Sequence, residues 1–388
     1  MPRKTLEVTV EPKVLVWARE SVGTDIHKVA KRLSVSVDTV AKWELGEKKP
    51  TLRALKELAR FYKRPLAVFF LPEPPKELPR PKDFRVLPEQ ERGKLSKETR
   101  LGLRNARRLQ SLAVELTKSI DREVTINIGK ANLTDNPETV AIRERERLSK
   151  EIQEQLDWKN SRQALNQWKK KIENLGILVF QFAMPVEEVR GFSLTEGGLP
   201  IIVLNLRDSV NARIFTLFHE YAHLLLGTSG ICNLEEGSEL PLGIEEFCNH
   251  FAGAVLVPKK HLLHHELLKS IRPYSEIPDE YLDRIATSFK VSQEVVLRRM
   301  EILELVTKDF YQRRREEWKV KVEKEKIRKK GFFVQPAKKC LLEKGLPFVS
   351  LVLETHKRGV ITYNDVVDYL SIRLKHLNKI EQLIKGES

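Results

Sequence analysis

The sequence predicts an α+β protein that is mostly helical, with an N-terminal helical bundle, a central domain and a helical C-terminal region. Apolar residues recur at helical spacing through most of the 388 residues, and two short apolar runs in the middle of the chain predict strands. A proline-rich stretch separates the bundle from the rest, because seven of the 19 prolines lie between Pro65 and Pro88. Hydrophobic residues make up 41% and charged residues 32%, which excludes a wholly disordered or fibrous chain.

The charge balance and the cysteines indicate a compartment and a class of partner. The net charge of +15 favours nucleic acid or an acidic protein as a partner. No apolar run approaches the ~18 residues of a membrane-spanning helix, and the N-terminus lacks the apolar stretch of a signal peptide. The three cysteines are widely spaced, as is typical of reduced thiols (Cys232, Cys248 and Cys340). We therefore expect a cytoplasmic protein that is not associated with a membrane.

The first 75 residues predict four short helices, each with a residue at one end that can cap or stop it. The first runs from Pro12 to Glu20, and Gly23 can close it. Each of the other three helices is preceded by a residue whose side chain can accept a hydrogen bond from a backbone N–H group of that helix. These helices are Ile26–Leu33 after Asp25, Val37–Leu45 between Ser36 and Gly46, and a helix from Thr51 through Tyr62.

The remaining elements are predicted from the same periodicities. The region from Trp158 to about Met300 mixes strands with long helices, whereas the flanking regions are helical. Between Lys308 and Lys339 the chain holds 13 basic and 5 acidic residues, which is typical of a solvated charged helix. We expect no internal repeat. The predicted elements are a helical stretch 87–119, a strand-like stretch 121–133, a helix 164–175, strands 177–182 and 200–205, helices 210–226 and 243–256, and two or three helices within 341–383.

A pair of histidines with a glutamate between them is the sharpest chemical signal. On a helix, His219 and His223 share a face and can present two imidazoles to one ion, while Glu220 can act as a general base. The surrounding helix is apolar nearly all round, so we expect these side chains to be buried rather than on a charged surface. Burying three ionisable groups without a metal would be costly, and the pattern therefore predicts a metal site.

A third protein ligand is expected on the next apolar helix. Glu245 and Asn249 lie one turn apart on one face, so one can bind the metal while the other hydrogen-bonds a ligand histidine. Glu246 lies on a different face of this helix and is the weaker candidate for the third metal ligand. Cys248 and His250 are alternative donors by chemistry, but a buried thiol and a helix-surface imidazole without a metal are the favoured explanations of these two residues.

These motifs together resemble the ImmA/IrrE family of metallo-endopeptidases. The similar segments are Arg213 with the motif His219-Glu220-x-x-His223, the strand 201–205, the helix 245–252 that ends in Leu256-Val257-Pro258, and the stretches 165–180 and 190–192. The resemblance implies a zincin-like domain in which His219, His223 and Glu245 bind one Zn²⁺ per chain, with Mn²⁺ as an alternative in the cell. It also implies that Glu220 is the general base and that Asn249 supports a ligand. Members cleave helix-turn-helix repressors or belong to mobile-element and stress-response circuits.

The same resemblance leaves one part of the site unidentified. No residue is singled out to stabilise the oxyanion of the tetrahedral intermediate. Arg213, Tyr221 and His250 are all near the motif in the sequence, and none of them is favoured.

The N-terminal bundle resembles the helix-turn-helix domains of Cro-repressor (XRE) type. Trp43-Glu44-Leu45-Gly46-x-x-x-Pro50 is similar to the end of their recognition-helix region, and Leu55, Leu58, Ala59, Tyr62 and Pro65 are similar to their closing helices. The resemblance implies that Asp38, Thr39 and Lys42 face bases or phosphates, with Lys48 and Lys49 close by. The family commonly has Gln where this chain has Ile26 and Val37, so we expect weak discrimination between bases.

The chain is therefore divided into four predicted parts with two competing functions. The parts are a helix-turn-helix domain at 1–75, a proline-rich linker and basic helical connector at 76–157, a peptidase domain at 158–305 and a basic helical region at 306–388. The favoured function is a zinc endopeptidase and transcriptional regulator that cleaves a partner protein, a helix-turn-helix repressor, and binds DNA through residues 1–75. The alternatives are a regulator without catalysis whose metal site is structural or sensory, and an antitoxin-like protein. The helical bundle could also serve to bind the substrate repressor.

Overall fold

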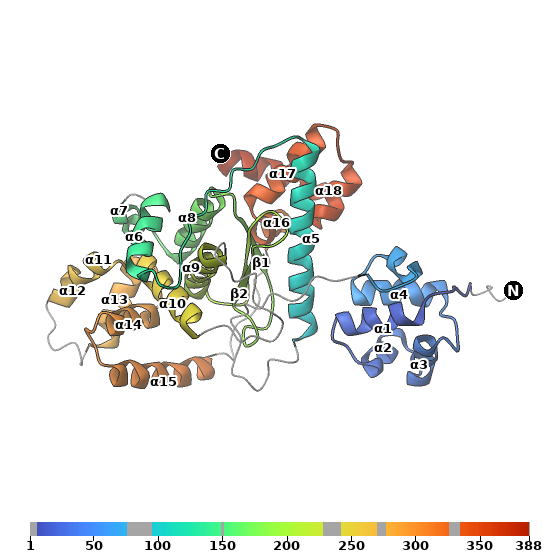
Figure 1. The fold of residues 1–388 in the computed structure, drawn as a ribbon, viewed down its shortest axis with the longest axis horizontal. Helices are drawn as coiled ribbons and strands as arrows, with labels where there is room; N and C mark the ends of the chain where they lie inside the picture. The colour runs from blue at the N-terminus through green and yellow to red at the C-terminus, as the bar shows by residue number, and fades with distance from the viewer. Residues whose placement is uncertain are drawn as a thin grey trace. The chain divides into compact units, whose positions relative to one another are not determined.

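A computed structural model gives the fold of the chain, which is mostly helical with one small sheet (Figure 1). The α+β, mostly helical class is confirmed. The structure describes residues 6–75, 95–148, 151–227, 242–269, 277–325 and 334–387. Cys232, much of the proline-rich stretch and part of the basic stretch 308–339 lie outside these residues. None of the described helices is long and apolar enough to cross a membrane.

The chain forms two compact units. The first consists of Met1–Pro81, Val86–Asn105 and Glu187–Val189, and the second of Lys82–Arg85, Ala106–Val186 and Arg190–Ser388. Helix α5 (Lys97–Ser119) contributes its first residues to the first unit and the rest to the second.

The first unit is a bundle of short helices around one apolar core. Its predicted capping contacts are present, because the side chains of Asp25, Ser36 and Thr51 each accept a hydrogen bond from the backbone three residues on. Gly46 ends the third helix in the left-handed conformation, as expected. The elements are α1 (Pro12–Ser21), α2 (Ile26–Leu33), α3 (Val37–Leu45), α4 (Leu52–Tyr62) and the 3-10 helix η1 (Leu66–Phe70).

The second unit contains a three-stranded sheet in the order β1-β3-β2. The central strand β3 (Ile201–Asn205) pairs in parallel with β1 (Leu178–Phe182) and antiparallel with β2 (Gly191–Leu194). Both predicted strands are confirmed. The strand-like prediction for 121–133 is wrong: this stretch is extended, but it bonds to separate segments, through Asn127 N–H to Leu175 and Ala131 N–H to Leu225, and forms no ladder.

Two adjacent helices, α9 (Val210–Gly227) and α10 (Leu242–Leu256), form the centre of the second unit. Helix α9 packs against β2 and β3, while α6 (Pro137–Leu148) packs on α10 and shares its apolar core. Helix α6 thus belongs to this core, although it lies within the stretch 76–157. The other helices are α7 (Ile152–Asp157), α8 (Ser161–Glu173), α11 (Lys259–Leu263), α12 (Glu266–Lys269), α13 (Asp279–Phe289), α14 (Gln293–Ile302), α15 (Lys308–Glu325), α16 (Pro336–Lys344), α17 (Leu346–Lys357), α18 (Tyr363–Leu370), η6 (Leu374–His376) and α19 (Leu377–Glu387).

Candidate metal centre

Helices α9 and α10 bring two histidines and a glutamate to one point. The Nε2 atoms of His219 and His223 lie 3.1 Å apart. The carboxylate of Glu245 lies 3.3 Å from the first of these atoms and 3.5 Å from the second. The histidines are 0% and 4% exposed, whereas the side chain of Glu245 is 35% exposed. The cluster is therefore buried on its α9 side and open beside α10.

The geometry of this cluster fits a metal ion. Zinc bonds of ~2.0–2.1 Å in a tetrahedral site place the ligand atoms about 3.3–3.4 Å from one another. The 3.1 Å between the two imidazole nitrogens is close to that value, as are the 3.3 and 3.5 Å from these nitrogens to the two different oxygens of Glu245. The ligand set of two imidazoles and one carboxylate is also one that zinc prefers, and three protein ligands leave a fourth position for water or substrate.

The Nδ1 atoms of both histidines, on the side of each ring away from the cluster, have partners that orient the rings. His219 Nδ1 lies 3.1 Å from Asn249 Oδ1, and because an amide oxygen only accepts, we assign the proton to Nδ1 and a lone pair to Nε2. His223 Nδ1 lies 3.6 Å from the thiol of Cys248. Asn249 thus lies where a supporting residue was expected, and Cys248 touches the side of His223 that faces away from the cluster. Glu246 is exposed and lies outside the cluster.

The acidity of Glu245 agrees with a site that attracts cations. Burial alone would raise the pKa of this carboxyl group, but the hydrogen bonds that His219 and His223 donate when their Nε2 atoms are protonated outweigh burial. The pKa of Glu245 consequently lies well below its usual range, so the group is a carboxylate at neutral pH.

Glu220 lies in the interior on the same helix and is held by a strand. Its side chain is 1% exposed, and its Oε2 accepts a hydrogen bond of 3.0 Å from the hydroxyl of Ser193 on β2. Strand β2 approaches α9 closely at Gly191, where a Cβ atom would lie 2.4 Å from Thr216 and 2.8 Å from the carbonyl of Val203. A glycine is required there for the strand to bring Ser193 to Glu220.

Ser193 was missed by the reasoning from sequence. The only signal is a hydroxyl residue in a strand that is buried throughout, between Phe192 and Leu194. Such a residue needs a hydrogen-bond partner, but the sequence does not show which one it has.

The three residues considered for the oxyanion are engaged in other contacts. Arg213 donates to Gln181 at 2.8 Å, and Tyr221 donates its hydroxyl proton to Glu144 at 2.7 Å. His250 lies 2.6 Å from Glu138, which also receives hydrogen bonds from Arg299. The described residues therefore favour none of the three.

The residues proposed to contact DNA lie on the surface of the first unit, but two of them neutralise each other. Asp38 and Lys42 form an ion pair of 2.8 Å along α3, and this contact raises the pKa of Lys42. Thr39 shares a hydrogen bond of 2.8 Å with the capping residue Ser36. Lys48 and Lys49 are exposed after α3. Phosphate contacts are thus available mainly from the segment that follows the recognition helix.

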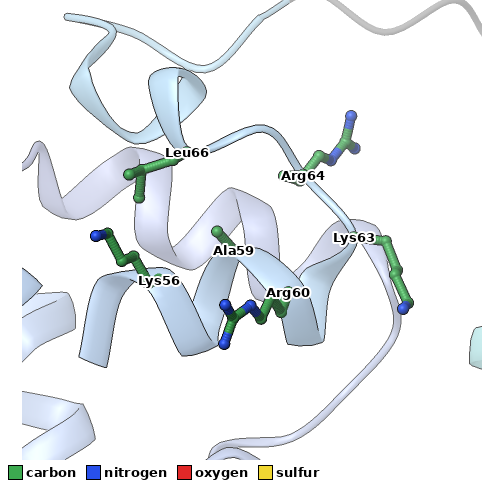
Figure 2. Close-up of a pocket in the computed structure, with 6 residues that line it drawn as sticks. All are labelled: Lys56, Ala59, Arg60, Lys63, Arg64 and Leu66. Carbon is green, nitrogen blue, oxygen red and sulfur yellow. The ribbon is translucent and has the colours of Figure 1, made fainter. Parts of the chain in front are cut away.

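A surface pocket in the same unit has a basic lining. It lies along α4 and η1 and contains none of the cluster residues of the second unit. Figure 2 shows that its cationic side chains point in different directions rather than toward a common point. The pocket is therefore a basic surface and has no shape that would select one anion. Its lining residues are Lys56, Ala59, Arg60, Lys63, Arg64 and Leu66.

Comparison with known families agrees with this division of the chain. Residues 172–301 match the IrrE N-terminal-like domain, a metallopeptidase family, and residues 15–69 match the helix-turn-helix family. The first match covers β1 to α14 and includes the whole His-Glu cluster; the second covers α2 and α3. No curated protein sequence matches the chain.

Proposed function

We propose that this chain, which joins an IrrE-like metallopeptidase domain to a helix-turn-helix domain, is a zinc-dependent endopeptidase that regulates transcription. The substrate in this proposal is a helix-turn-helix repressor of a mobile-element or stress-response circuit. The observation that carries the proposal is the position of Glu220. It is a buried carboxylate next to His219 in the sequence, hydrogen-bonded by Ser193, and it is not one of the three clustered ligands. A purely structural metal site needs ligands but has no use for such a group.

In this proposal, His219, His223 and Glu245 hold the ion. When bound, zinc supplies Lewis acidity, which acidifies water and polarises a peptide carbonyl. Asn249 and Cys248 hold the imidazole rings so that their Nε2 atoms face the ion.

Glu220 performs the proton transfers. Its carboxylate takes a proton from the attacking water and delivers it to the nitrogen of the leaving amine. Ser193 keeps the carboxylate in one rotamer, so that the same oxygen atoms face water and then the amine.

In this proposal, the first unit supplies the DNA binding through which the protein regulates transcription. It binds DNA weakly and with little base preference, because Ile26 and Val37 stand at the starts of α2 and α3 and the Asp38–Lys42 pair has no net charge. Lys48 and Lys49 provide phosphate contacts.

The test is a cleavage assay with the full-length protein and the repressor encoded beside its gene. Wild-type protein should cut the repressor at one place, and 1,10-phenanthroline should stop the reaction until zinc is restored. Glu220→Gln should keep the metal and lose at least about 10³-fold of the rate, since the base is removed and the ligands remain. Full activity of Glu220→Gln would overturn the proposed role of this residue. A metal-loaded wild-type protein that cleaves neither this repressor nor a panel of helix-turn-helix proteins would favour the non-catalytic regulator.

A further inference from the structure

The turn between α2 and α3 has the same backbone geometry as two turns in the second unit. In each turn one residue is left-handed, with φ of 56° at Ser34, 60° at Lys290 and 53° at Ser371. The N–H groups of that residue and of the next one bond to carbonyls three and five positions back in all three turns. Such a helix end is common by itself, and these three turns share further features in the residues around them.

The buried positions around these turns also recur at the same spacing. A buried residue lies five positions before the left-handed residue, and two more lie six and nine positions after it. At α2–α3 and at α13–α14 this spacing packs the second helix across the first, whereas α19 packs on α16. The three sets are Val29, Val40 and Trp43; Ile285, Val296 and Arg299; and Val366, Leu377 and Ile380. The sequences of the three segments differ, but the turn and its core positions recur.

The starts of α18 and η6 lie at one pocket, whereas α18 itself packs mainly on α17. Tyr363, the first residue of α18, and Leu374, the first after the turn, line one pocket of the C-terminal region. They stand at the positions that Ile26 and Val37 occupy in the first unit. One difference is that the second helix begins with the 3-10 turn η6 and packs on α16.

Only one of the two further motifs leaves its second helix accessible. Helix α14 packs on α10, and its Arg299 is 1% exposed, so this helix is part of the interior. The corresponding surface of η6 and α19 is open, and apart from Leu374 its exposed side chains are basic or carry amides. They are Arg373, Lys375, Asn378, Lys379, Gln382 and Lys385.

We propose that η6 and α19, which follow the turn after α18, form a second nucleic-acid-binding surface, which binds duplex DNA through the exposed side of α19. Where α3 has Ala41 and Leu45, α19 has Asn378 and Gln382, the residue types that hydrogen-bond adenine in the major groove. Where α3 has the acid Asp38, η6 has Lys375.

The charge of this surface favours duplex DNA over a protein partner. Among the described residues, Arg373, Lys375 and Lys385 have no ion-pair partner, so their charges are available to phosphates. The nearby acids of α18 are engaged elsewhere, because Asp365 completes the cap of its own helix and Asp368 pairs with Arg108. The half-buried Glu381 is the acid closest in sequence to these cations whose side chain the structure describes.

The test compares two double variants of the full-length protein that remove equal charge. Lys375→Ala/Lys379→Ala changes the proposed surface, and Lys338→Ala/Lys339→Ala changes exposed lysines of α16. Binding to a fluorescent 40-base-pair duplex from the protein's own promoter is measured by anisotropy from 50 to 200 mM salt. The first variant should bind about 10-fold or more weakly at low salt, with a salt slope reduced by about 2, and the second should behave as wild type.

A second comparison tests base recognition. Asn378→Ala/Gln382→Ala should reduce the preference for the promoter over a shuffled duplex by about 10-fold, with little change in the salt slope. Unchanged affinity and slope in Lys375→Ala/Lys379→Ala would overturn the proposal. Equal or tighter binding of wild type to single-stranded RNA of the same length would overturn it as well. Neither readout involves peptide cleavage, so the proposal stands or fails independently of the peptidase.

Discussion

The hydroxyl group of Ser193 donates a hydrogen bond to Glu220, and in the proposed mechanism this contact orients the carboxylate. Ser193 lies on an edge strand of the sheet, and the hydrogen bond of 3.0 Å joins two side chains that are almost fully buried. In Ser193→Ala the carboxylate loses this donor but keeps its place on α9. A general base that is no longer held in one rotamer loses part of its rate, while the ligands of the ion are unaffected.

We therefore expect Ser193→Ala to lower kcat about 10-fold with unchanged zinc content and little change in KM. Ser193→Thr, which keeps the hydroxyl, should restore most of the rate. Cleavage kinetics with the metal content of each preparation provide the measurement. A variant that loses zinc in proportion to its activity would contradict a role confined to orienting the base.

The residues of the cluster could be predicted from sequence because their spacing is local. His219 and His223, like Glu245 and Asn249, stand one helical turn apart, so a single helix places each pair on one face. Ser193 could not be predicted, since its contact with Glu220 depends on how the sheet packs on α9. Long-range packing of this kind leaves no periodic signal in the chain.

At the scale of secondary structure, α6 carries acids that tie α9, α10 and α14 together. Glu138 accepts hydrogen bonds from His250 and the fully buried Arg299, and Glu144 accepts one from Tyr221. Burial raises the pKa of Glu138, but the hydrogen bonds from His250 and Arg299 outweigh burial and lower the pKa to about 2. The folded state thus prefers the ionised form of Glu138.

The stability that Glu138 contributes should depend on pH in a defined direction. Because its pKa is lowered from 4.5, the contribution is complete above about pH 4.5 and disappears as the pH falls toward 2. Glu138→Gln leaves Arg299 buried without its counter-charge and should reduce the free energy of unfolding by about 3 kcal/mol at pH 7.

Urea unfolding from pH 7 to pH 3 is the measurement for this prediction. The difference between wild type and Glu138→Gln should shrink below pH 4.5. Glu146→Gln, an exposed acid on the same helix, is the matched control and should change little. A difference that stays constant over the whole range would show that Glu138 acts through packing rather than charge.

The helices of the first unit were predicted almost to the residue, whereas α6 was not identified. Caps such as Asp25, Ser36 and Thr51 act within one turn, so the sequence shows them directly. Helix α6 buries charged residues, Glu144 and Arg145, which weakens the contrast between apolar and polar faces on which prediction depends.

At the scale of the whole molecule, the chain joins a metallopeptidase-like domain to a helix-turn-helix domain. The net charge of +15 is spread over both units: Lys48 and Lys49 follow α3, and Lys375 and Lys379 lie on the C-terminal helices. The proposed function requires that the cluster on α9 and α10 holds a metal ion.

Metal content per chain tests that claim most directly. Wild-type protein purified in the presence of zinc and then dialysed should retain about one ion per chain by elemental analysis. Glu220→Gln should retain the same amount, because Glu220 is not a ligand in this account. His219→Ala/His223→Ala should retain none and should also unfold more easily, since Glu245 loses both imidazole partners. Stoichiometric zinc in the double histidine variant, or none in the wild-type protein, would contradict the account.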